Sequence, residues 1–270
     1  MFRLAVLYGI GREINRTPFF NANKACQIQA MKEIKMIFPN YYSFAKLLDA
    51  DRNDTAFRDT FFDVCRYENI TGLDETFLLF KYNMPQYYIF FANYSEDIRY
   101  FMKFDEMLKQ SVKNFANSLF MSDNSHKFCI HIRRGDFIRK SYKYQESRSE
   151  FILPASVFIN KYLKQEGHEN ISLVILGQDD EFKHALQFNS SIFHEIYYPS
   201  LLSRGHDMAF GTMYCDTYLI TASISTFAWW TAFLMPEGKR VFYNGNVLKD
   251  GKYYDYDKVF LPHWKKLDLN

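Results

Sequence analysis

The chain has 270 residues, of which 48% are hydrophobic, 19% aromatic and 24% charged, and its formal net charge is +2. This composition is typical of a globular protein with one large or two ordinary domains, and so small a net charge gives no reason to expect a nucleic-acid partner. No window of about 18 apolar residues occurs, which excludes a bilayer-spanning segment in the sequence given, and its first residues do not open a signal peptide.

The four cysteines do not form a CxxC pair, which argues against a zinc site and leaves scattered disulfides or free thiols open. They are Cys26, Cys65, Cys129 and Cys215. Cys129 lies inside an apolar run, so we expect it to be a buried thiol.

Six Asn-x-Ser/Thr sequons weigh against the cytoplasmic location that the lack of a signal peptide favours. They are Asn15, Asn53, Asn69, Asn93, Asn170 and Asn189. This number exceeds what chance placement gives, and it indicates a glycosylated, lumenal protein.

The first part of the chain, residues 1–125, is predicted to be one domain of mixed character. The apolar spacing predicts a helix over 2–13, a strand after Pro18, helices over 44–48 and 100–119, and a strand over 87–91. All of these have apolar faces suited to a core. Nothing among them suggests chemistry.

From residue 126 to 270 the pattern changes to a regular alternation of strands and helices. Strands are predicted at 128–132, 171–176, 196–198, 217–221 and 240–243, and helices at 154–165, 181–186, 207–214 and 227–234. The strands are apolar on both faces, which is typical of a parallel sheet covered by helices on both sides. We therefore expect a Rossmann-like second domain.

Three polar loops follow strands of this sheet, at 131–136, 177–180 and 223–226. Ligands bind at the carboxyl ends of such strands. The first loop carries Arg133 and Arg134, and a planar guanidinium group can bind two phosphate oxygens at once. Asp136 can orient an arginine or face a substrate. The alternative is a surface ion pair after a strand.

The third loop places Ser223, Ser225 and Thr226 just before a predicted helix. Hydroxyls and free backbone N–H groups at a helix N-terminus bind anions, phosphates above all. The alternative is a helix cap with incidental hydroxyls. Two anion-binding loops at one edge of a sheet suggest a diphosphate ligand.

Asp207 precedes a predicted helix and is expected either to cap it or to accept hydrogen bonds from N1–H and N2–H2 of a guanine ring. Trp229 and Trp230 are expected to pack against the sheet, with sugar stacking as the alternative. The sequence contains no GxGxxG, P-loop, HExxH or GxSxG motif, so nicotinamide, P-loop nucleotide, zinc-protease and hydrolase functions lack support.

These motifs carry a resemblance to a known family. The segment His131-Ile132-Arg133-Arg134-Gly135-Asp136-Phe137, together with Asp207-Met208 and the segment from Ser223 to Ala232, resembles the α-1,2-fucosyltransferase family, glycosyltransferase family 11. The resemblance covers the second half well and implies a GT-B-like α/β fold with two Rossmann-like halves, the first incomplete. It also implies GDP-fucose as donor, a glycan acceptor, inversion at the fucose anomeric carbon, and neither a metal nor another cofactor.

The resemblance further implies roles for single residues. Arg133 would bind the diphosphate and neutralise the leaving GDP, assisted by Arg134, while His131 would lie beside the nucleotide and Asp207 would bind guanine. Ser225 and Thr226, in the same loop as Ser223, would hold phosphate oxygens. A base is needed for the acceptor hydroxyl, and Asp136 is our choice.

The chain departs from the family at its start. The family has a Gly-x-Gly-Asn-Gln segment just before the Met-Phe that begins this sequence, and we expect a shortened form that also lacks a membrane anchor. Three functions follow as hypotheses: a Golgi fucosyltransferase acting on a terminal galactose, a non-catalytic nucleotide-sugar-binding module of the same fold, and an enzyme of another nucleotide-sugar class.

Overall fold

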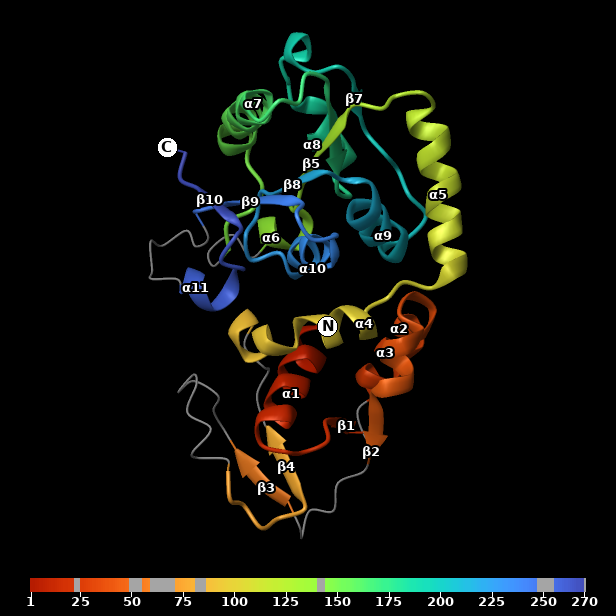
Figure 1. Cartoon of the computed structure of the whole chain (residues 1–270), viewed down its shortest axis with the longest axis vertical. Helices are drawn as coiled ribbons and strands as arrows, with labels where there is room; N and C mark the ends of the chain where they lie inside the picture. Colours follow the sequence, from red (N-terminus) through yellow and green to blue (C-terminus); the bar gives the residue numbers. More distant parts are fainter. Residues whose placement is uncertain are drawn as a thin grey trace. The chain divides into compact units, whose positions relative to one another are not determined.

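The computed structural model describes residues 1–21, 25–48, 55–58, 71–80, 86–139, 144–246 and 255–269, and the chain forms two compact units (Figure 1). The first unit comprises Met1–Asp105 with Asp255–Leu261, and the second Glu106–Tyr254 with Pro262–Asn270. The expected α/β class with parallel sheets is confirmed. The structural division falls at residue 105 and the sequence-based one at residue 125, because helix α5 (Glu106–Phe120) packs with the second unit.

The first unit has two small parallel sheets among its described residues, one formed by β1 and β2 and one by β3 and β4. The strands are β1 (Phe19–Asn21), β2 (Lys46–Leu48), β3 (Thr55–Arg58) and β4 (Phe77–Phe80). The helices are α1 (Phe2–Glu13), α2 (Ala25–Ile37), α3 (Pro39–Phe44), α4 (Ser95–Phe101) and α11 (Tyr256–Val259), with 3-10 turns η3 (Tyr88–Phe90) and η4 (Ala92–Tyr94). The unit's core includes the buried face of α1.

Three predictions for the first unit are wrong. The run at 87–91 is a 3-10 turn instead of a strand. The prediction failed because a short apolar run shows no hydrophobic period by which a strand could be told from a helical turn. Residues 44–48 are the end of α3 and strand β2, and the helix predicted over 100–119 is interrupted between α4 and α5. At that break, the backbone N–H of Asp105 bonds to the carbonyl of Ile37, a contact that sequence spacing cannot reveal.

The second unit is built on one six-stranded parallel sheet of order β10-β9-β8-β5-β6-β7. Its strands are β5 (His126–His131), β6 (Ile171–Leu176), β7 (Ile196–Tyr197), β8 (Thr217–Ile220), β9 (Arg240–Asn244) and β10 (Lys265–Leu267). The five predicted strands are confirmed; β10 was not predicted. Its first two residues are exposed lysines and only Leu267 is buried, so it carries no alternating pattern.

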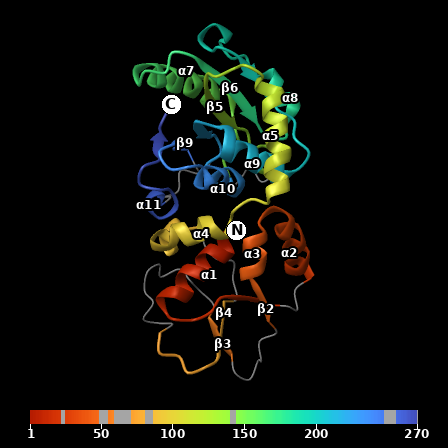
Figure 2. The same cartoon turned by 45° about the vertical axis from the view of Figure 1, so that its right-hand side comes forward.

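Helices cover both faces of this sheet, as predicted. They are α5 (Glu106–Phe120), α6 (Gly135–Arg139), α7 (Ser149–Gln165), α8 (Asp180–Ala185), α9 (Arg204–Tyr214) and α10 (Thr226–Leu234), with a 3-10 turn η5 (Ser190–Ile192). Figure 2 shows α7 on one side of the sheet and α5 with α9 on the other. The α7 side forms a continuous apolar core with residues such as Phe128, Ile130 and Ile159, each fully buried.

Helix α7 begins five residues before Pro154, so the prediction that this proline lies near the first turn is wrong. A proline there removes one backbone hydrogen bond, and the buried side chains around it hold the helix.

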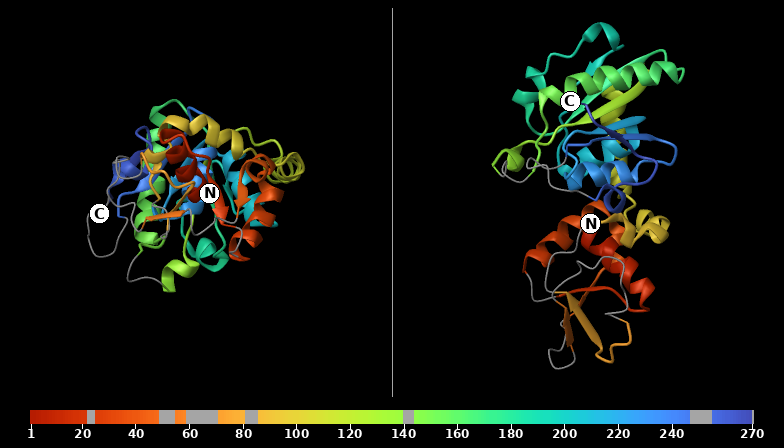
Figure 3. Two further views of the ribbon diagram at one scale, coloured as in Figure 1. Left: turned by 90° about the horizontal axis from the view of Figure 1, so that it is seen from below. Right: turned by 90° about the vertical axis from the view of Figure 1, so that its left-hand side faces the viewer.

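At the edge of the sheet formed by β10, this strand and α7 lie side by side (Figure 3), where the ammonium of Lys265 lies 4.1 Å from the centre of the Tyr162 ring. Trp229 and Trp230 are buried, which confirms that they pack inside the unit.

In the described part of the chain, no helix is long and apolar enough to cross a membrane.

Candidate functional site

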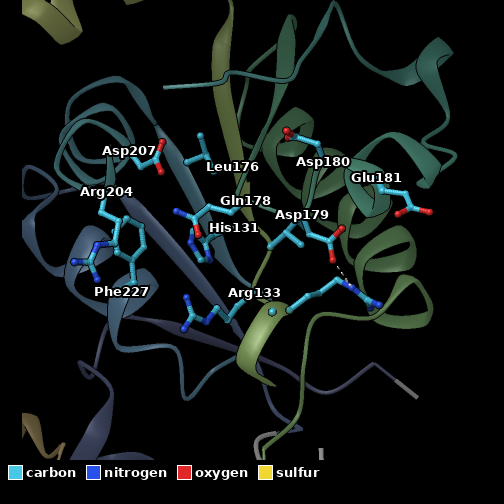
Figure 4. A pocket seen from close by; sticks show the side chains of 14 residues that line it. His131, Arg133, Leu176, Gln178, Asp179, Asp180, Glu181, Arg204, Asp207 and Phe227 are labelled. Atoms are coloured by element: carbon cyan, nitrogen blue, oxygen red, sulfur yellow. Dashed lines mark hydrogen bonds and ion pairs between the residues drawn. The ribbon is translucent and has the colours of Figure 1, made fainter. Parts of the chain in front are cut away.

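A cavity of about 490 Å³ opens at the carboxyl ends of β5 and β6 (Figure 4). Parallel strands β5, β6 and β8 are neighbours in the sheet, so the loops that follow them meet at one edge. The lining residues are His131, Ile132, Arg133, Arg134, Gly135, Leu176, Gly177, Gln178, Asp179, Asp180, Glu181, Arg204, Asp207 and Phe227. All of them belong to the second unit.

The close approach of the loops after β5 and β6 requires a glycine. Gly177 has a φ of 126°, and a Cβ added to it would lie 2.4 Å from the carbonyl oxygen of Ile132. The backbone N–H of Ile132 continues the ladder by donating to the carbonyl of Leu176 at 2.8 Å. The cavity floor is thus formed by two strands that remain in register until they end.

Arg133 lies at the mouth of the cavity with its guanidinium partly exposed. Its Nη2 donates to Oδ1 of Asp136 at 2.6 Å, and its guanidinium carbon lies 5.2 Å from the centre of the Phe137 ring. Its Nε atom is buried and has no hydrogen-bond partner among the described residues. Because the guanidinium is partly exposed and pairs with one carboxylate, its outer N–H groups can still donate to a ligand.

Arg134 is held more firmly than its neighbour. Its Nε donates to Oδ2 of Asp179 at 3.0 Å, and its Nη1 donates to the carbonyl of Ser147 at 3.1 Å. Its guanidinium also lies over the ring of Phe182, 3.9 Å from the ring centre. The contacts with Asp179 and Phe182 join the loop after β5 to the start of α8, and the bond to Ser147 joins it to the residues just before the helix that begins at Ser149.

His131, the last residue of β5, is 5% exposed. Burial, aided by the positive charge of Arg133, lowers the pKa of His131 to about 3, so the imidazole is neutral near pH 7. Its Nδ1 has no hydrogen-bond partner within the described ranges, and its ring centre is 5.3 Å from that of Phe227. The histidine thus lines the cavity as a neutral ring with one unpaired, buried nitrogen.

Asp207 lies in the first turn of α9 and does not cap it; the cap is Ser203, whose Oγ accepts from the N–H of His206 at 3.4 Å. The capping alternative for Asp207 is therefore wrong, because the helix begins earlier than its apolar residues indicate. Burial raises the pKa of Asp207 to about 6, and Lys183 offsets only part of this effect. Figure 4 places Asp207 and Arg204 on the same side of the cavity.

Ser223, Ser225 and Thr226 are at the same sheet edge but do not line this cavity. The hydroxyl of Ser223 donates to the carbonyl of Asn244 at 2.5 Å, and Ser225 caps α10 by accepting from the N–H of Ala228. The capping alternative is therefore realised for Ser225. A role of these hydroxyls in phosphate binding stays a prediction.

Among the lining residues, Gln178, Asp179, Arg204 and Phe227 were not selected from the sequence as site residues. The loop at 177–180 was recognised as polar, which could have pointed to Gln178 and Asp179. Phe227 lies in the segment that carries the family resemblance but was given no role there. Arg204 carried no signal, because α9 begins three residues before its predicted start.

Cys129 and Cys215 form a disulfide, with Cα atoms 5.7 Å apart, so the expectation of a buried thiol at Cys129 is wrong. The two residues are 86 positions apart in sequence. They meet because β5 and β8 are neighbours in the sheet. The order of strands in a sheet cannot be predicted from the sequence of one segment.

Over the ranges that the structure describes, no group of three or more His, Cys, Asp or Glu side chains is arranged to hold a metal ion.

The sequence of residues 32–268 matches the family described as Glycosyl transferase family 11. The chain belongs to glycosyl transferase family 11. It is 25% identical over 257 residues to the Caenorhabditis elegans protein named "Putative galactoside 2-alpha-L-fucosyltransferase svh-11", covering 90% of this chain and 67% of that protein. It is also 23% identical over 305 residues to a galactoside 2-alpha-L-fucosyltransferase of the same organism, covering 100% and 74%.

Among solved structures, this member of family 11 is similar to the crystal structure of NodZ alpha-1,6-fucosyltransferase soaked with GDP-fucose. The two are 13% identical, the TM-score is 0.48, and the similarity covers 89% of this chain and 88% of the other.

Proposed function

We propose that this chain is an inverting fucosyltransferase that transfers fucose from GDP-fucose to a galactoside hydroxyl, forming an α-1,2 linkage. The observation that carries the proposal is the cavity at the edge of the parallel sheet, which is lined by both Arg133 and the half-buried Asp207. Membership of glycosyl transferase family 11 and the names of the two C. elegans relatives support the reaction class and the linkage.

The donor would be held at both ends of its nucleotide diphosphate. Asp207 would accept hydrogen bonds from N1–H and N2–H2 of guanine, with neutral His131 and the Phe227 ring beside the base. Arg133 would bind the diphosphate through its fork of N–H donors. The base specificity would follow from Asp207, because uracil cannot offer two adjacent donors to one carboxylate.

Departure of the diphosphate from the sugar builds negative charge on its oxygens, and a preorganised guanidinium stabilises that charge as it forms. Arg133 would provide this stabilisation without a metal ion, and Asp136 would accept the proton of the acceptor hydroxyl. Metal independence predicts that transfer continues at the same rate after treatment with EDTA. A loss of activity that Mn²⁺ or Mg²⁺ restores would contradict it.

The test is release of the nucleoside diphosphate with a terminal β-galactoside as acceptor: GDP from GDP-fucose, compared with GDP from GDP-mannose and UDP from UDP-galactose as control donors. We expect release from GDP-fucose only, and a product in which the linkage to the 2-hydroxyl is read by NMR. Tight GDP binding without turnover would overturn the enzyme and favour the non-catalytic nucleotide-sugar-binding module. A preference for another donor would overturn both.

We also propose that the protein works in the Golgi lumen. The disulfide between Cys129 and Cys215 supports an oxidising compartment, and the sequon asparagines Asn93, Asn170 and Asn189 are exposed. Secreted protein should therefore lose mass on treatment with peptide N-glycosidase. Unchanged mobility would contradict a glycosylated, lumenal protein.

A further inference from the structure

Ser147 is a fully buried serine just before α7, and it contacts both arginines of the cavity. Its Oγ accepts from the backbone N–H of Arg133 at 2.7 Å, and its own N–H donates to the carbonyl of Arg133 at 2.9 Å. Its carbonyl accepts from Nη1 of Arg134. Each polar group of this serine is thus directed at the double-arginine segment.

The Oγ of Ser147 also lies 2.6 Å from Oγ1 of Thr221, a fully buried residue that directly follows β8. Thr221 in turn donates to the carbonyl of His131 at 2.5 Å. Since that carbonyl can only accept, the single proton of Thr221 is used there, and Ser147 must donate to Thr221. The direction of each bond is therefore fixed, from the N–H of Arg133 through two hydroxyls to the carbonyl of His131.

This chain of hydrogen bonds closes a ring through the backbone from residue 131 to residue 133, the stretch in which β5 ends and the cavity begins. It joins three elements: the loop after β5, the start of α7 and the end of β8. Bonds in such a chain polarise one another, and each buried hydroxyl that lost its partner would be costly to leave unpaired. The backbone that carries Arg133 consequently has one well-defined position.

We propose that Ser147 and Thr221 are positioning residues that hold Arg133 and Arg134 where the charge of the leaving diphosphate develops. The proposal rests on the proposed function of the cavity. Neither hydroxyl lines the cavity, so each acts through the arginines. A displacement of about 1 Å can lower a rate about 100-fold, so Ser147→Ala and Thr221→Val should lower kcat at least about tenfold.

The same substitutions should leave KM for GDP-fucose within about threefold. In the intact donor, the phosphate attached to fucose does not yet carry the additional negative charge that develops when the bond to the sugar breaks. They should weaken GDP binding at least about tenfold, since GDP carries the charge of the departed group. A nearly unchanged KM for GDP-fucose together with weaker GDP binding distinguishes positioning from a general loss of folded protein, because unfolding would not affect the two ligands differently.

The experiment compares kcat, KM for GDP-fucose, Kd for GDP by calorimetry, and thermal unfolding of the full chain. Thr221→Ser retains the hydroxyl and should restore kcat and Kd to within about threefold of wild type. Ser156→Ala is the matched control, because Ser156 is equally buried in α7 and its hydroxyl donates to the carbonyl of Leu153 at 2.7 Å, outside the cavity.

Losses in Ser147→Ala and Thr221→Val no larger than in the Ser156→Ala control would overturn the proposal, as would failure of Thr221→Ser to restore function. If Ser147→Ala does not fold, Thr221→Val decides alone, since it nearly preserves side-chain volume. If neither folds, the hydroxyls are purely structural and the proposal is wrong. GDP binding separates this proposal from the proposed function. If the wild-type chain binds GDP without turnover, the enzyme is refuted and the Kd for GDP of the variants alone decides the positioning role; a chain that binds no GDP refutes both.

Discussion

Arg133 and Arg134 are adjacent in the chain but are held in different ways. Arg134 is fixed by Asp179, the carbonyl of Ser147 and the Phe182 ring, whereas Arg133 has one carboxylate partner at the mouth of the cavity. From the sequence, both were assigned to the diphosphate. Their surroundings favour Arg133 as the ligand-binding member and Arg134 as the residue that fixes the loop.

Arg133→Lys should lower kcat roughly 100-fold although the charge is kept, because an ammonium group cannot reproduce the planar fork. The steady-state rate of GDP release from GDP-fucose measures it. The matched control is Arg240→Lys at the start of β9, where Arg240 pairs with Glu166 outside the cavity. Equal rates in the Arg133→Lys variant and the control would refute the assigned role.

The raised pKa of Asp207 predicts a pH dependence of donor affinity. Below about pH 6 the carboxyl gains a proton and no longer accepts two hydrogen bonds, so GDP-fucose should bind about tenfold more weakly at pH 5 than at pH 7.5. GDP-fucose is the ligand to use, because the terminal phosphate of GDP titrates in the same range. Asp207→Asn should bind weakly at both pH values, and an unchanged pH dependence in this variant would contradict the assignment.

Asp207 should also reduce the stability of the fold near neutral pH. Its folded pKa of about 6 lies above the ordinary value of 3.8, so between these values the folded state binds more protons than the unfolded state. Stability therefore falls as the pH rises through this window. Asp207→Asn should raise the unfolding temperature at pH 7 and change it little at pH 4, and a lower unfolding temperature at pH 7 would contradict the prediction.

At the scale of elements, the alternation after residue 126 was enough to predict five strands of the sheet and their helices. Buried parallel strands are continuous apolar runs, and these stand out in the sequence. Helix starts were less predictable: α7 and α9 begin before their apolar stripes, and this placed Pro154 and Asp207 wrongly. The shared edge of loops 131–136 and 177–180 was predictable, but the buried link through Ser147 was not, because it depends on three-dimensional contacts.

The disulfide between Cys129 and Cys215 joins β5 to the residues before β8 and should contribute roughly 2 to 5 kcal/mol to stability, given a separation of 86 residues. Replacing both cysteines by alanine should lower the denaturant midpoint accordingly, measured by guanidinium unfolding. A reductant should shift the wild-type midpoint toward that of the variant. Equal midpoints for the oxidised wild type and the double variant would show that the bond adds no stability.

At the scale of the whole molecule, the class and the existence of two parts were predictable, whereas the path of the chain between them was not. Residues 255–261 belong to the first unit although they follow the second unit's β9 in sequence. No local sequence pattern predicts that the chain comes back to the first unit, because this depends on contacts between distant segments. The pairing of β10 with β9 escaped prediction for the same reason.

This return has a consequence for how the protein is made. The outermost strand β10 pairs with β9 only after the intervening residues 255–261, which belong to the other unit, have been synthesised. Residues up to 267 must therefore be synthesised before β10 can complete the sheet. Until then β9 is an open strand edge, exposed to pairing with other nascent chains, which makes β10 a safeguard against aggregation during synthesis.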